Sequence, residues 1–138
     1  HEHTLMGLGD GGAHVGTICD GSYPTFGLIH WGRDRSRGEK IDLPILVHNQ
    51  TQANAAAVGL LDRGVLVVGK RADVNVIDFD NLNIERPVMV YDLPAGGGRL
   101  QQKTSGFIAT LVRGDTTYSF GEATDALPGR LIRGRQPA

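Results

Sequence analysis

The chain has 138 residues, of which 40% are hydrophobic and 21% are charged, and its 14 Lys and Arg nearly balance its 15 Asp and Glu. This composition is typical of a soluble globular domain. The near-zero net charge argues against nucleic acid or a membrane surface as a partner, and no stretch approaches the roughly 20 apolar residues of a membrane span. The single cysteine, Cys19, excludes an intramolecular disulfide, so we expect a cytoplasmic protein.

A glycine-rich segment near the start carries the first candidate chemistry. The sequence GLGDGGAH, residues 7–14, surrounds one carboxylate, Asp10, with four glycines. We expect residues 4–8 to form a short strand, which places Asp10 in the loop after it. Catalytic groups of α/β proteins lie in such loops, and glycines let a substrate or metal approach the backbone. The alternative is an ordinary Asp-Gly-Gly turn, and the spacing alone leaves both interpretations open.

The spacing of the histidines does not indicate a complete metal site. His14 follows Asp10 by four residues, but one aspartate and one histidine are too few for zinc, which takes three or four protein ligands. His30 and His48 fall in predicted helices, where we expect them to pack or to face solvent. Cys19 has no CxxC partner and is expected to be a small, partly buried side chain.

Helices are predicted in the first half of the chain. Residues 26–37 have an imperfect apolar face and a charged end, which indicates a first helix. Asp42 as a cap and Pro44 in the first turn predict a second helix that runs to about residue 49. Thr51 is then expected to cap a third, alanine-rich helix over residues 52–58.

Strands are predicted in the second half, after a helix stop at Gly59. Residues 72–79 alternate apolar and polar side chains, which is the pattern of a half-buried strand. Residues 107–112 and 116–120 repeat this pattern on either side of a short turn, residues 113–115, and so predict a β-hairpin. The chain is therefore expected to be mainly β with a few helices, in the α+β class.

Four stretches together resemble the C-terminal part of a metal-dependent amidohydrolase of the N-acyl-D-amino-acid deacylase (D-aminoacylase) family. They are GLGDGGAH, TQANAAAVGLLDRGVLVVGKRADVNVIDFD, VYDLPAGGGRLQQKTSGFIATLVRGD and GEATDALPGRLIRG, and they span nearly the whole chain in the expected order. The resemblance implies that residues 1–59 are the end of a TIM-type barrel, with its last strand and helices. It implies that residues 60–138 belong to a small β-sandwich.

The same resemblance implies an activity. Such an enzyme hydrolyses the amide bond of N-acyl amino acids or related amides with the help of zinc. By this resemblance Asp10 is the general base and proton shuttle and a candidate metal ligand, while Gly11, Gly12 and His14 lie against the substrate. The other metal ligands come from earlier barrel strands, so the remainder of the enzyme chain is a necessary partner. We therefore expect the 138-residue chain alone to be inactive.

A second hypothesis from a different class stays open at this point. The chain could be a stand-alone β-rich binding or interaction module, in which Asp10 is only a turn residue. If the chain is instead part of a barrel, its strand edges and apolar surface lack their partners, which predicts self-association of the chain.

Overall fold

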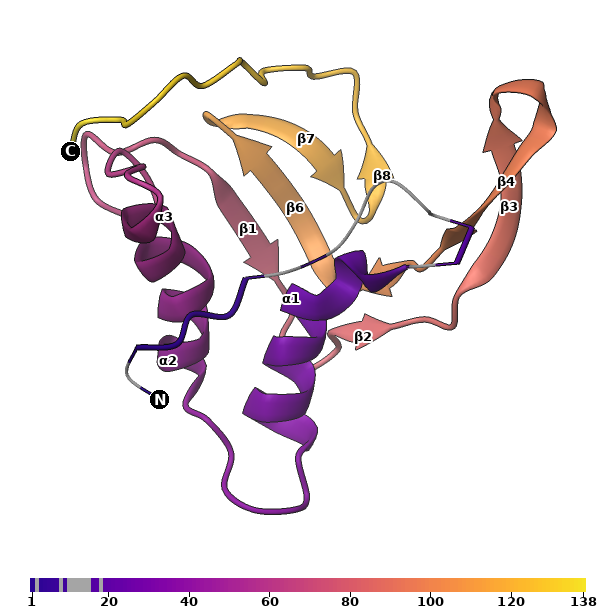
Figure 1. Cartoon of the computed structure of the whole chain (residues 1–138), viewed down its shortest axis with the longest axis horizontal. Helices are drawn as coiled ribbons and strands as arrows, with labels where there is room; N and C mark the ends of the chain where they lie inside the picture. The colour runs from indigo at the N-terminus through magenta and orange to yellow at the C-terminus, as the bar shows by residue number, and fades with distance from the viewer. Residues whose placement is uncertain (2, 8, 10–15, 18) are drawn as a thin grey trace.

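The computed structural model describes residues 1, 3–7, 9, 16–17 and 19–138. Within this part of the chain, two helical stretches lie beside antiparallel β-sheets in a mixed α and β arrangement (Figure 1). All the described strands lie between residues 74 and 123, after the two helical stretches, in the half of the chain where the sequence predicts most of its strands. None of the described helices is long and apolar enough to cross a membrane.

The first helical stretch is one continuous run of three segments. They are η1 (Asp20–Ser22), α1 (Tyr23–Phe26) and the wider-turned η2 (Gly27–Asp34). The stretch starts earlier than predicted because Pro24 lies in the first turn of α1, where its fixed φ favours a helix. It ends three residues before the predicted residue 37, because Arg35 adopts an extended backbone with ψ 123°.

The second helical stretch is also continuous. It comprises α2 (Leu43–His48), η3 (Asn49–Ala53) and α3 (Asn54–Ala57). The predicted break at Thr51 is wrong, because the Thr51 hydroxyl donates to the Val47 carbonyl at 2.6 Å inside the helix rather than capping a new one. Asp42 precedes the helix, but its side chain makes no capping hydrogen bond. The predicted stop is confirmed at Gly59, which has φ +77°.

The predicted strand at residues 4–8 is wrong over its described part. Residues 4–7 form no β-ladder, and residue 8 lies outside the described residues. The segment instead crosses the helices, where the Asn54 side-chain amide donates to the Met6 carbonyl at 2.6 Å. A strand forms only beside a hydrogen-bonding neighbour, and no other described strand lies next to this segment.

Six strands form one long, nested antiparallel ribbon. They are β1 (Val74–Ile77), β2 (Asn83–Ile84), β3 (Val88–Leu93), β4 (Gly97–Gln101), β5 (Thr104–Ser105) and β6 (Phe107–Val112). Strand β1 pairs with β6, β2 with β5 and β3 with β4, so the ribbon folds back at η4 (Pro94–Gly96). The predicted strand at residues 72–79 is confirmed as β1. The β3–β4 arm projects away from the body of the molecule (Figure 1).

The predicted hairpin at residues 107–120 is confirmed. Strand β6 pairs with β7 (Asp115–Ser119), and β8 (Glu122–Ala123) extends the sheet to the order β1-β6-β7-β8. The turn holds two residues rather than three, because Asp115 already pairs with Val112. Arg113 and Gly114 both have positive φ, at 57° and 89°, as tight two-residue hairpin turns require.

A small core joins the helices to the ribbon. Its buried hydrophobic residues, within the described part of the chain, are Leu28 from η2, Leu46 from α2 and Leu82 from the loop between β1 and β2, of which Leu46 and Leu82 are fully buried. The Arg33 guanidinium reaches from the first helical stretch to this loop, residues 79–82. It donates hydrogen bonds to the carbonyls of Phe79, Asp80 and Leu82 at 2.6, 3.0 and 2.9 Å.

Gly106 closes the other side of the same loop. Its φ of +95° is one that L side chains rarely adopt, and a Cβ added there would lie only 2.7 Å from the Leu82 Cα. The close approach of β-ribbon backbone to loop backbone therefore requires glycine at this position.

The chain exposes much surface for its size. It has 9829 Å² of accessible surface, whereas a compact monomer of 14.8 kDa is expected to expose about 7,000 Å². Large hydrophobic side chains contribute to it, among them Leu66, Tyr91 and Phe120, which are 80%, 73% and 77% exposed. The molecule therefore offers extensive apolar surface to other polypeptide.

We expect Gly106→Ala to lower the free energy of unfolding by about 2 kcal/mol or more, because it adds backbone strain and a contact too close for Cβ. Gly121→Ala is the matched control, since Gly121 has φ +83° but no atom within 4 Å of an added Cβ. Urea unfolding of the two variants measures the difference. Equal losses would show that the approach to Leu82 does not matter.

We expect Arg33→Lys to lower the urea midpoint of unfolding, because a lysine ammonium group cannot reproduce the planar guanidinium that donates hydrogen bonds to three carbonyls. Arg86→Lys, at an exposed position of the described chain, is expected to leave the midpoint unchanged. A midpoint for Arg33→Lys that matches the control would refute the structural role of Arg33.

Candidate functional site

The site residues predicted from the sequence lie outside the described residues. These are Asp10, Gly11, Gly12 and His14. The described residues before this segment show where it starts. A Cβ added at Gly7 would contact the Asn54 side chain at 3.8 Å, and one added at Gly9 would lie 3.8 Å from the Gly21 Cα. The approach to the predicted loop therefore passes both helical stretches.

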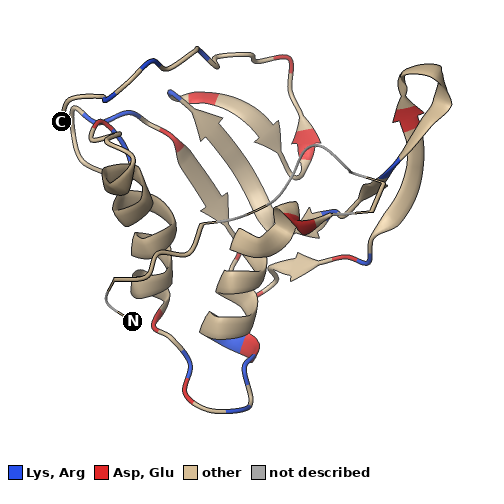
Figure 2. Ribbon diagram, in the orientation of Figure 1, with Lys and Arg blue, Asp and Glu red and all other residues tan. Residues whose placement is uncertain are grey.

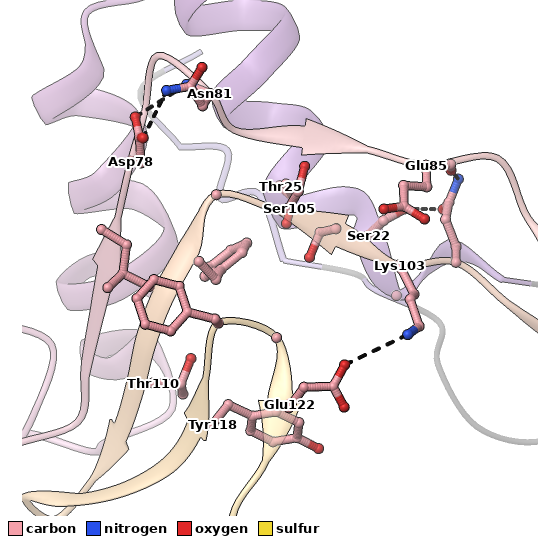
Figure 3. A pocket seen from close by; sticks show the side chains of 18 of the residues that line it. Ser22, Thr25, Asp78, Asn81, Glu85, Lys103, Ser105, Thr110, Tyr118 and Glu122 are labelled. Carbon is pink, nitrogen blue, oxygen red and sulfur yellow. Dashed lines mark hydrogen bonds and ion pairs between the residues drawn. The ribbon is translucent and has the colours of Figure 1, made fainter.

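The described residues form a cleft of about 960 Å³ (Figure 3). It lies between the start of the first helical stretch, the loop after β1 and the strands β5 to β8. Its polar lining, shown in Figure 3, includes Ser22, Thr25, Asp78, Asn81, Glu85, Lys103, Ser105, Thr110, Tyr118 and Glu122. We call it the β-face cleft.

The β-face cleft carries a negative charge. Three of its lining residues, Asp78, Glu85 and Glu122, are carboxylates, whereas Lys103 is the one lining residue with a positive charge. The Lys103 ammonium is 3.9 Å from a Glu122 carboxylate oxygen, and both side chains are largely exposed, so their attraction is weak.

Asp78 is held in its charged form. Its carboxylate accepts hydrogen bonds from the Asn81 side-chain amide at 2.8 Å and from the Asn81 backbone N–H at 3.3 Å. These hydrogen bonds, with that of the side chain the stronger, lower the pKa of Asp78 below its ordinary value. The carboxylate therefore stays ionised at neutral pH.

Buried and apolar groups complete the cleft. Thr25 is only 7% exposed and belongs to the lining. The Ser22 hydroxyl donates to the Gln102 side-chain oxygen at 2.5 Å and ties the helix to the ribbon. Tyr118 pairs with Thr110, and the Phe120 N–H donates to the Ile108 carbonyl, which places these side chains along one sheet face. The cleft combines carboxylates, hydroxyl groups and aromatic rings.

The sequence also leads to predictions about metal ligands and about the surroundings of His30, His48 and Cys19. In the part of the chain that the structure describes, no three His, Cys, Asp or Glu side chains come together to hold a metal ion. His30 packs as expected, with its ring stacked on Phe26 at 5.1 Å and edge-on to Trp31. His48 is exposed, and Cys19 is a free, half-buried thiol, as the sequence predicts.

Sequence analysis did not find the β-face cleft. Its residues come from four regions that are far apart in the chain, so no local motif marks them. The one available signal was Gly106 inside an apolar β segment, which indicates close approach of backbone at that point.

The comparison with known protein families gives one match. The model of the amidohydrolase family matches residues 1–118, which include both helical stretches and the ribbon. No curated protein and no solved structure matches the chain. Because the match covers well over half of the chain, the chain belongs to the amidohydrolase family, a family of hydrolases that act on C–N bonds.

Proposed function

We propose that the chain is the C-terminal part of a metal-dependent amidohydrolase that hydrolyses the amide bond of N-acyl amino acids, N-acyl-D-amino acids among them. The observation that carries this proposal is the family match over residues 1–118. That match includes GLGDGGAH, the segment in which the resemblance to D-aminoacylases places the general base.

We propose that residues 1–59 form the end of the enzyme's barrel and residues 60–138 a segment of its β-sandwich. The helical stretches support this assignment, because they present Tyr23, Phe26, Ile45 and Val47 to solvent, each at least 44% exposed. The large accessible surface also supports this assignment. The chain exposes 9829 Å², whereas a compact monomer of its mass would expose about 7,000 Å², so roughly 2,800 Å² is available for the rest of the enzyme to cover.

In the proposed reaction Asp10 is the general base. It accepts a proton from the attacking water and returns it to the leaving amine, which is the exchange that amide hydrolysis needs. Gly11 and Gly12 let the substrate approach the backbone, and His14 lies against it. The described residues do not fit a zinc site, so the proposal assigns the metal ligands to the remainder of the enzyme, with Asp10 as the candidate from this chain.

The alternative function is a stand-alone β-rich binding module. The β-face cleft favours it, because exposed aromatic rings beside carboxylates are suited to binding. A binding module does not account for a family match that also includes the helical first half of the chain. We therefore keep hydrolysis as the proposed function of the whole enzyme.

We expect the purified 138-residue chain to show no turnover of N-acyl amino acids in the presence of added zinc, because it brings too few ligands to hold the metal. A colorimetric assay of released amino acid tests this. Turnover that persists through rigorous purification would show that the chain is a complete enzyme.

In the full-length enzyme, we expect Asp10→Asn to lower kcat by about 10²-fold or more with little change in KM, because a general base acts in the transition state. Asp42→Asn, at an exposed position before the second helical stretch, is the matched control and should retain full activity. Full activity of the Asp10→Asn variant would show that Asp10 is not the general base and is only a turn residue.

A further inference from the structure

We propose that the β-face cleft binds the C-terminal tail of a second copy of this chain. The tail, residues 124–135, follows β8 and contains no helix or strand. It runs along the outside of the molecule from β8 to the end of the second helical stretch (Figure 1). This inference is independent of the hydrolase activity proposed above.

Charge complementarity identifies the tail as the occupant. The tail carries Arg130, Arg133 and Arg135 against one carboxylate, Asp125, and these arginines are exposed. Figure 2 shows the basic positions along the tail and the acidic β8 at the cleft. The cleft carries three carboxylates against one ammonium, so tail and cleft have opposite net charge.

The tail and the cleft also both expose apolar side chains. In the tail, Leu127 and Leu131 are 93% and 77% exposed and alternate with the arginines. In the cleft, Tyr118 and Phe120 are 49% and 77% exposed on the same sheet face. Docking would bury these leucines against aromatic rings, which is favourable by the hydrophobic effect.

The tail that enters a cleft must come from another copy. At its start the Thr124 N–H donates to the Thr117 carbonyl at 2.9 Å. At its end the Gln136 N–H donates to the Gly59 carbonyl at 2.9 Å, and the Leu61 N–H donates to the Gln136 carbonyl at 3.2 Å. These bonds tie the two ends of the tail to β7 and to the end of the second helical stretch, and the arginines of the tail are not among the residues that line the chain's own cleft. Reciprocal exchange of tails between two copies gives a two-fold dimer, whereas one-way docking gives a ring or a longer assembly.

Sedimentation velocity of the 138-residue chain, with paired charge reversals, tests the proposal. We expect reversible association that weakens as salt is added. Glu85→Lys with Glu122→Lys in the cleft, and Arg130→Glu with Arg133→Glu in the tail, should each weaken association at least tenfold. Mixing these two double variants should restore it, because an acidic tail then meets a basic cleft.

A control variant separates the site from general charge effects. Glu39→Lys with Asp115→Lys changes the net charge by the same amount at exposed positions outside the cleft, and should associate as the original chain does. A chain that stays monomeric up to ~1 mM, or charge reversals that do not rescue each other, would overturn the proposal.

Discussion

The hydrogen bonds from Arg33 to the loop between β1 and β2 are the interaction on which the rest of the structure depends. Three residues of this loop, Phe79, Asp80 and Leu82, present carbonyl oxygens towards the first helical stretch, and one guanidinium donates to all three. Leu82 is thereby held fully buried between Leu28 and Leu46, and Gly106 approaches its backbone from the ribbon. Because carbonyls at such a junction need donors, the helical layer and the β-ribbon are joined at this loop.

Around this junction the hydrophobic core is small, and the molecule is correspondingly open. Apolar side chains cover the outer sides of both helical stretches, the projecting β3–β4 arm and the sheet face of Tyr118 and Phe120. Such surfaces lie inside larger folds or at interfaces. The helical surfaces fit the proposed barrel, whose remaining strands would cover them, and the sheet face belongs to the cleft proposed to receive the tail of a second copy.

The chain therefore presents two regions with different chemistry. The glycine-rich segment that contains Asp10 belongs to the part of the sequence that matches the amidohydrolase family and carries the proposed base. The β-face cleft, formed by described residues, has carboxylates, hydroxyl groups and aromatic rings, which suit recognition of a cationic segment. The two proposals rest on different residues, so each can be tested without the other.

The sequence by itself determined the features that depend on neighbours along the chain. Alternation of side chains predicted β1, positive-φ turn chemistry predicted the β6–β7 hairpin, and Gly59 marked the end of the helices. Tertiary structure decided the rest, because the deciding contacts join distant residues. Residues 4–7 lack a neighbouring strand and cross the helices instead, and Thr51 bonds within a continuous helix. The β-face cleft exists because Ser22 meets Gln102, 80 residues away, and no local periodicity encodes a contact of that range.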